Sequence, residues 1–143
     1  MTGEVRQKIL HASTVAFGGR AVLIQGAAGA GKSSLALDLI SRGGQLIADD
    51  RTIVTERDGV LIASAPENLA GRIEARGVGI LAAEPAGSGI VVLAADLDRP
   101  EPARLPERRK LALLDVEIDL ILAQGNANIA PAIHLYLLGG RTD

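Results

Sequence analysis

A glycine-rich stretch, GAAGAGKSS at residues 26–34, carries the residue types that hold phosphate groups. It consists of a glycine, four further residues and then Gly-Lys-Ser, which is the spacing of a P-loop. Glycines let consecutive backbone N–H groups converge on phosphate oxygens, and the helix that follows adds the positive end of its dipole. We therefore expect this stretch to bind a nucleotide or its phosphates. The expected binding residues are Gly26, Ala27, Ala28, Gly29, Ala30, Gly31, Lys32, Ser33 and Ser34.

Two side chains of this stretch have expected roles of their own. The ammonium group of Lys32 would bridge the β and γ phosphates of ATP, and the hydroxyl of Ser33 would be a ligand of the Mg²⁺ ion that neutralises them. The alternative is a glycine-rich turn with an exposed lysine. The strand expected before the stretch and the amphipathic helix expected after it favour phosphate binding over that alternative.

The neighbouring elements must position this loop. Residues 13–17 and 21–25 predict two strands joined by a glycine turn, and the second strand leads into the loop. A helix over residues 32–42 and a strand over residues 45–48 should follow. Because a strand, a crossover helix and a parallel strand wind right-handed, the last strand should end beside the loop. The aspartate pair at 49–50 would then lie at the carboxyl edge of the sheet, where ligands bind.

The aspartate pair could supply an acid–base group. Consecutive side chains of an extended chain point in opposite directions, so one carboxylate can face the Mg²⁺–phosphate site while the other is tied to the structure. A carboxylate there could accept the proton of an attacking hydroxyl group, or return it in the reverse reaction. The alternative is a solvated turn or a helix cap, because Asp is common at such places.

The rest of the chain completes a prediction of one α/β domain over residues 1–143. Its patterns indicate a hairpin over 51–64, a buried strand over 89–97, a polar loop over 99–110, a half-exposed strand over 111–122 and a terminal helix beginning near Pro131.

Composition excludes several classes of function. A net charge of −2 gives no basic field for nucleic acid, and the absence of cysteine excludes disulfides, thiol catalysis and cysteine-ligated zinc. Residues 1–10 contain no apolar segment of signal-peptide length, and no stretch approaches the roughly 18 apolar residues of a spanning helix. We therefore expect a cytoplasmic protein whose partners include neither nucleic acid nor membrane.

Three segments together resemble a known family. His11 before the glycine-turned hairpin, the stretch GAAGAGKSSLALDLISRGGQLIADD and the segment IEARGVGIL at residues 73–81 resemble the catalytic domain of HPr kinase/phosphorylase. That bifunctional enzyme acts on a serine of the phosphocarrier protein HPr. The resemblance spans residues 10–81 and implies a P-loop kinase domain with a mixed sheet. It also implies ATP and Mg²⁺ as cofactors, and an HPr-type carrier, phosphate or pyrophosphate as partners. Members of the family form hexamers.

The resemblance also implies roles for individual residues. His11, Lys32 and Asp50 would be catalytic, and Ser33 and Glu74 would be the Mg²⁺ ligands. The residue types alone leave alternatives open: a lone histidine is more often structural.

Glu74 has a plainer alternative too. As a surface glutamate it could pair with Arg72 or Arg76, because exposed ion pairs are common and weak.

Two departures from the family affect what we expect. The resemblance begins near residue 10, so we expect no separate N-terminal domain like that of long members, which resembles the short form of alphaproteobacteria. The family also carries a Pro-Gly-Arg-Asn stretch near its end, where residues 122–131 contain no arginine. We therefore expect kinase activity with a weaker phosphorylase, unless Arg104, Arg108 or Arg109 folds back or a neighbouring subunit supplies a guanidinium group.

Three classes of function remain open. The Asp pair and EARGVGI favour a protein-serine kinase with phosphorylase activity. A small-metabolite kinase would need an arginine-bearing lid, for which residues 99–110 are the candidate. A nucleotide-binding regulator would tolerate loss of Asp50 but not of Lys32. The aromatic residues are Phe17 and Tyr136, so base stacking does not point to the adenine site.

Overall fold

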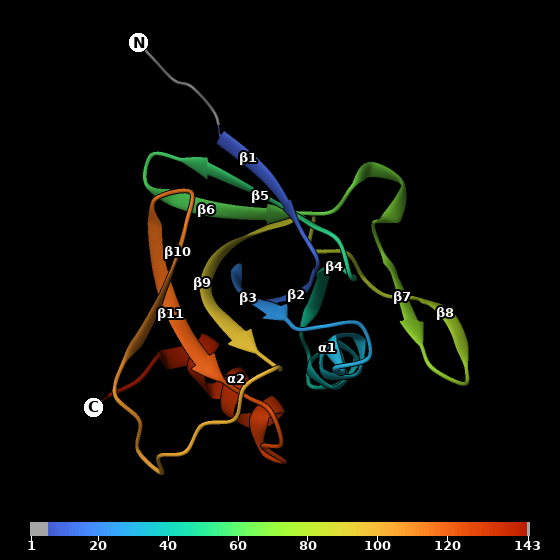
Figure 1. Cartoon of the computed structure of the whole chain (residues 1–143). Coiled ribbons are helices and arrows are strands. Elements are labelled where there is room, and N and C mark those ends of the chain that lie inside the picture. The colour runs from blue at the N-terminus through green and yellow to red at the C-terminus, as the bar shows by residue number, and fades with distance from the viewer. Residues whose placement is uncertain (1–5, 143) are drawn as a thin grey trace.

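A mixed sheet of nine strands forms the centre of the fold (Figure 1). The computed structural model describes residues 6–142, so the first five residues of the N-terminal stretch discussed above lie outside the described part. The described elements are β1 Arg6–Leu10, β2 Ala12–Phe17, β3 Arg20–Gln25, α1 Lys32–Ser41, β4 Gln45–Ala48, β5 Thr52–Arg57, β6 Val60–Ser64, a 3-10 turn Glu67–Leu69, β7 Arg72–Ala75, β8 Gly79–Ala82, β9 Ser88–Asp96, β10 Arg109–Leu113, β11 Val116–Leu122 and α2 Ile129–Gly139.

The strand order explains how the loop after β3 meets distant parts of the chain. The sheet runs β1-β5-β6-β9-β3-β2-β4, and β11 pairs with β9 and carries β10 on its other side. Strands β3, β9 and β11 are parallel to one another, whereas β2 is antiparallel to both β3 and β4. The carboxyl ends of β3, β4, β9 and β11 therefore lie at one edge, and loops at this edge form the ligand sites of open α/β sheets.

The alternating residues of the central strands divide the core into two layers. On β3, Val22 and Ile24 belong to the cluster that packs against both helices, whereas Leu23 belongs to a second cluster on the opposite face. The second cluster includes Val54 and Leu61 of the β5–β6 hairpin, which curls over that face. Both helices lie on the same side of the sheet (Figure 1). The apolar strands are thus buried on both faces, as expected for parallel strands in α/β proteins.

The predicted α/β class with a mixed sheet is confirmed, and most predicted elements are present. The hairpin turn at Asp58 and Gly59 has φ values of 53° and 79°, as a two-residue hairpin loop requires. The prediction of one domain over residues 1–143 stays a prediction.

Two details of the prediction were wrong. The segment 111–122 lies in a hairpin, because Leu114 and Asp115 adopt left-handed φ values of 48° and 62° and reverse the chain between β10 and β11. Strand β1 was missed, since its polar sequence belongs to an edge strand, which among the strands of residues 6–142 pairs with β5 alone. The prediction of a terminal helix beginning near Pro131 is confirmed: α2 begins at Ile129, and Pro131 is tolerated there because the first-turn N–H groups have no partner within the helix.

A smaller hairpin, β7–β8, extends beside α1 and stands apart from the main sheet (Figure 1). Its inward side chain Ile73 is 1% exposed and belongs to the helix-side core. Neither helix in the part of the chain from 6 to 142 has the length and apolar character that crossing a membrane requires.

Two adjacent leucines test how α2 packs on the sheet. Leu137 is fully buried, whereas Leu138 is 62% exposed. Leu137→Ala should lower the free energy of unfolding by about 2–5 kcal/mol, because it removes buried contacts and leaves a cavity. Leu138→Ala should change it by less than about 0.5 kcal/mol. Urea denaturation of both variants measures this, and equal losses would show that the register of α2 is different.

Candidate active site

The glycine-rich loop connects β3 to α1 at the carboxyl edge of the sheet. Gly29 and Gly31 have φ values of 85° and 104°, which residues with a Cβ rarely adopt, so the loop needs glycine at both positions. Gly31 caps the N-terminus of α1, and its carbonyl oxygen accepts the N–H of Leu35 at 3.0 Å. The backbone N–H groups at the start of α1 therefore face the loop, as in anion sites at helix N-termini.

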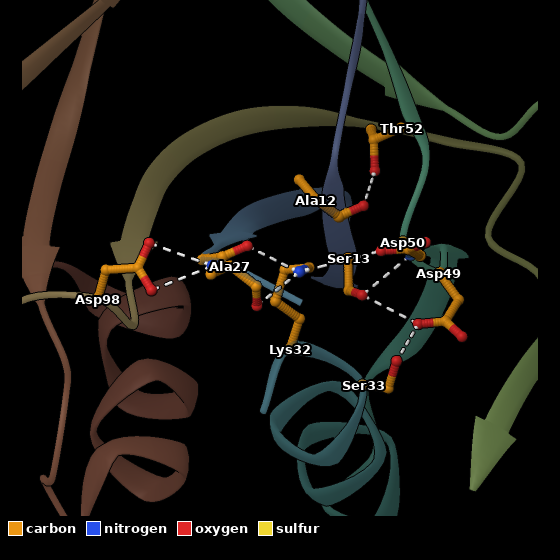
Figure 2. Close-up of polar contacts among 10 residues, drawn as sticks. Ala12, Ser13, Ala27, Lys32, Ser33, Asp49, Asp50, Thr52 and Asp98 are labelled. Atoms are coloured by element: carbon orange, nitrogen blue, oxygen red, sulfur yellow. Dashed lines mark hydrogen bonds and ion pairs between the residues drawn. The ribbon is translucent and has the colours of Figure 1, made fainter. Parts of the chain in front are cut away.

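The side chain of Lys32 lies across the base of the loop. It is only 8% exposed, and its ammonium group donates to the carbonyl oxygens of Gly26 at 2.7 Å and Ala27 at 3.2 Å (Figure 2). The same nitrogen lies 3.9 Å from Oδ1 of Asp50. A largely buried cation is thus positioned where the loop and the Asp49–Asp50 segment converge.

The carboxylate of Asp49 joins three segments of the site. Its Oδ1 accepts hydrogen bonds from the hydroxyls of Ser13 at 2.9 Å and Ser33 at 2.7 Å (Figure 2). Its Oδ2 accepts the N–H of Glu74 at 3.1 Å. Because the Ser33 hydroxyl donates its proton to Asp49, its lone pairs stay available to a cation. Asp49 therefore orients the P-loop serine, as carboxylates near the Mg²⁺ site of P-loop proteins do.

Asp50 differs from its neighbour in both backbone and exposure. Its φ of 64° is left-handed, so the expected extended conformation of the pair was wrong. The N–H of Asp50 donates to Oγ of Ser13 at 3.0 Å, while the Asp50 side chain is 62% exposed. The separation of one tethered and one accessible carboxylate, which the sequence suggested, is therefore present but arises from a turn.

A pocket of about 230 Å³ collects most of the predicted site residues. Loop residues line one wall, including Lys32 and Ser33. Asp49 and Asp50 line another wall, and Glu74 and Arg76 of the β7–β8 hairpin complete it. Cationic and anionic side chains therefore share one small cavity at the start of α1.

Four predicted residues lie outside the lining of this pocket. Gly26 and Ala27 contribute through the carbonyl oxygens that hold Lys32, and Ala30 faces an adjoining groove. His11 is exposed in the link between β1 and β2, two residues before Ser13. It thus lies next to β2, whose Ser13 contacts both aspartates, but it does not line the pocket. Its catalytic role stays a prediction.

The predicted Mg²⁺ ligands Ser33 and Glu74 both line the pocket. Within residues 6–142 no three His, Cys, Asp or Glu side chains gather as a metal cluster. A hydroxyl and one or two carboxylates nevertheless fit Mg²⁺, which usually completes its shell with phosphate oxygens and water. Ser33 and Glu74, with Asp50 beside them, are the residues that would hold the ion.

Asp98 is a site residue that the sequence analysis missed. Both of its carboxylate oxygens accept the N–H of Ala27, at 3.0 and 3.1 Å (Figure 2). The backbone N–H of Asp98 donates to Oδ1 of Asp96 at 2.8 Å, and Nε of Arg99 donates to Oδ2 of Asp96 at 2.7 Å. Burial raises the pKa of the Asp96 carboxyl, but these donors outweigh burial and hold the pKa below its usual value. The sequence did offer one signal for Asp98: it directly follows the buried strand predicted over residues 89–97, at the edge of the sheet where ligands bind.

The arginine that lines the phosphate pocket is Arg76, which the sequence suggested could pair with Glu74 or reach phosphate. In contrast, Arg104, Arg108 and Arg109 are not among its lining residues. Arg109 donates to both carboxylate oxygens of Glu101 at 3.1 Å. The loop before β10 thus does not serve as an arginine-bearing lid in this structure.

Comparison with known proteins identifies relatives. The model of the HPr Serine kinase C-terminal domain matches residues 5–91. The HPr kinase/phosphorylase of Clostridium botulinum (strain Eklund 17B / Type B) is 47% identical over 72 residues, which cover 50% of this chain and 24% of the relative. That of Lactococcus lactis subsp. lactis (strain IL1403) is 46% identical over 82 residues, covering 56% and 26%.

A solved structure extends the similarity to nearly the whole chain. The Hpr(Ser) kinase/phosphatase from Coxiella burnetii matches with a TM-score of 0.76 and 28% sequence identity. The match covers 92% of this chain and 93% of that one. In contrast, the chain spans about a quarter of the length of the curated relatives it matches.

The buried ammonium group of Lys32 gives a direct test of phosphate binding. Lys32→Ala should weaken ATP binding by at least about tenfold, because charge-assisted hydrogen bonds of about 1.5–3 kcal/mol are lost. Lys8→Ala, on an exposed position of β1, is the control and should leave the affinity unchanged. Isothermal titration calorimetry measures both, and equal affinities for the two variants would remove the phosphate site from this loop.

Proposed function

Because the chain belongs to the family of HPr serine kinase C-terminal domains, we propose that it is an ATP-dependent protein-serine kinase acting on an HPr-type phosphocarrier protein, with reverse phosphorylase activity. The observation that carries this proposal is the pocket in which Lys32, Ser33, Asp50 and Glu74 meet. Its walls combine a phosphate-binding loop with an accessible carboxylate, which are the groups that phosphoryl transfer to a hydroxyl requires.

In the proposed forward reaction the serine hydroxyl of the carrier attacks the γ phosphorus of ATP. The new Oγ–P bond forms as the bond between the γ phosphorus and the β,γ-bridging oxygen breaks, and ADP leaves. Asp50 accepts the hydroxyl proton, and Lys32 stabilises the charge that develops on the transferred group. Mg²⁺ held by Ser33 and Glu74 would neutralise phosphate charge.

In the proposed reverse reaction inorganic phosphate attacks the phosphoserine. A phosphate oxygen bonds to the phosphoserine phosphorus, the Oγ–P bond breaks, and pyrophosphate forms. Protonated Asp50 returns a proton to the serine oxygen, because the same group serves both directions by microscopic reversibility. The Asp50 side chain is exposed, so a serine on the surface of a folded carrier protein can reach it, which supports a protein substrate.

Other features of the relatives' biology remain proposals for this chain. His11 would act beside the Ser13–Asp50 contact, and its catalytic role rests on the resemblance. A hexamer and a cytoplasmic location stay predictions.

The experiment that tests the function uses purified protein, γ-labelled ATP, Mg²⁺ and purified HPr. We expect label on one serine of HPr, and release of labelled pyrophosphate when phosphate is then added. Binding of ATP without transfer would instead favour a regulator, and transfer to small metabolites alone would favour a metabolite kinase.

The two aspartates should respond differently to the same substitution. Asp50→Asn keeps the shape but cannot accept a proton, so transfer to HPr should fall by roughly 100-fold or more while ATP affinity changes little. Asp49→Asn should mainly weaken Mg²⁺–ATP binding, because the amide has one acceptor oxygen and no charge, and so cannot hold the Ser33 hydroxyl and the Glu74 N–H as the carboxylate does. Single-turnover rates and calorimetry separate the effects, and the opposite assignment would show that Asp49 is the base.

Glu74 should control the requirement for metal. Glu74→Gln should raise the Mg²⁺ concentration needed for half-maximal activity, because a charged oxygen ligand becomes neutral. Glu117→Gln, an exposed site on β11, is the matched control. A Mg²⁺ titration that is the same for both variants and the wild type would return Glu74 to a surface role.

Arg76 should replace the arginine that residues 122–131 lack. It lines the phosphate pocket, where a guanidinium group can hold inorganic phosphate by two hydrogen bonds. Arg76→Ala should therefore slow phosphorolysis more than phosphorylation, and Arg76→Lys should restore only part of the rate. Arg104→Ala is the control, and loss of phosphorolysis in that variant alone would contradict the assignment. The two rates are measured with one preparation of HPr.

A further inference from the structure

A shallow groove of about 480 Å³ continues from the phosphate pocket along α1. Its lining includes Ser34 and Asp38 of α1, Leu97 after β9, and Asn126 and Ile129 after β11. The groove and the phosphate pocket share Gly31 and Ser34. A ligand whose phosphates occupy the pocket can therefore extend past Ser34 directly into this groove.

The topology places the groove on the side of the loop opposite to the aspartates. Strands β9 and β11 lie on one side of β3, and β2 and β4 lie on the other. The segments after β9 and β11 form one wall of the groove, whereas Asp49 follows β4. The reacting end of a bound phosphate chain would therefore lie beside the aspartates, and the group attached to its other end would lie in the groove.

We propose that this groove binds the nucleoside of the nucleoside triphosphate, an inference that rests on the proposed kinase function. Its floor is aliphatic: Leu97 is 9% exposed and packs in the helix-side core, and Ile129 packs against the same core. Neither Phe17 nor Tyr136 lines the groove, so the base lies against aliphatic side chains. The volume falls within the range of small-molecule sites, about 300–1,000 Å³.

Two polar side chains supply hydrogen bonds to the nucleoside. Oδ1 of Asp38 accepts a hydrogen bond from Nε–H of Arg42 at 3.0 Å. The carboxylate has further lone pairs, which can accept a hydrogen bond from a ribose hydroxyl. Oδ1 of Asn126 accepts the N–H of Asn128 at 2.9 Å, which leaves the amide NH₂ of Asn126 to donate to a ring nitrogen of the base. Adenine and guanine both offer such nitrogens, so the groove should distinguish them weakly.

A neighbouring cavity of about 440 Å³ is the competing location for the base. It lies between the loop before β10, β11 and α2, and shares Asn126 and Ile129 with the groove. However, its lining includes no residue of the phosphate pocket. The direct continuity through Ser34 therefore assigns the nucleoside to the groove.

The test compares ATP with inorganic tripolyphosphate, which carries the phosphates without the nucleoside. Calorimetry in Mg²⁺ should show that the wild type binds ATP at least about tenfold more tightly, from one or two hydrogen bonds and apolar contact. Asp38→Asn and Asn126→Ala should each lower the affinity for ATP by about three- to tenfold. Each should leave the affinity for tripolyphosphate within about twofold of the wild-type value. ATP and GTP should bind within about tenfold of each other.

A blocking substitution gives a stronger version of the test. Ala127 is an exposed residue of the groove, and Ala127→Trp should reduce ATP affinity to that of tripolyphosphate. Leu135→Trp adds the same side chain to an exposed position of α2 outside the groove and should leave the ratio unchanged. Unchanged tripolyphosphate binding also shows that each variant is folded.

The outcomes separate the inference from the proposed function. Equal binding of ATP and tripolyphosphate by the wild type, or an ATP preference that all groove variants retain, would overturn the nucleoside site while the phosphate site stands. A preference for ATP over GTP beyond about 100-fold would overturn it as well, because the groove offers no contacts for that selectivity. Failure of both ligands to bind would overturn the proposed function together with this inference.

Discussion

The carboxylate of Asp49 is the interaction on which the arrangement of the site depends. It accepts hydrogen bonds from Ser13 on β2, from Ser33 at the start of α1 and from the backbone of Glu74 on β7. A half-buried carboxylate requires such donors, because removing it from water without them is costly. One side chain therefore sets the distances between the P-loop, the aspartate turn and the hairpin that carries Glu74.

The sheet order gives the site two sides with different chemistry. On the side of β2 and β4 lie the carboxylates, beside the end of the phosphate chain where transfer would occur. On the side of β9 and β11, Asp98 holds the N–H of Ala27 and braces the first residues of the loop. The loop is thus held at its first residues by Asp98, after β9, and at the start of α1 by Asp49, after β4.

The sequence was most informative where local spacing determines the structure. The P-loop, α1 and the aspartates after β4 follow from spacing and from the handedness of the crossover. The turn at Leu114 lacks a glycine or asparagine signal, so the β10–β11 hairpin was read as one strand. Asp98 reaches the site through the pairing of β9 with β3, which are distant in sequence, so no local pattern reveals its contact with the loop. Arg76, in contrast, lies in the turn of the local β7–β8 hairpin, within a segment that the sequence analysis had singled out.

A double-mutant cycle tests most directly whether Asp49 acts through Ser33 on a metal–phosphate site. Ser33→Ala, Asp49→Ala and the double variant are compared with the wild type for Mg²⁺-dependent ATP affinity by calorimetry. We expect Asp49→Ala to weaken binding strongly in the wild type and little once Ser33 is absent, with a coupling energy of about 1 kcal/mol or more. Effects that add within about 0.3–0.5 kcal/mol would contradict this linkage.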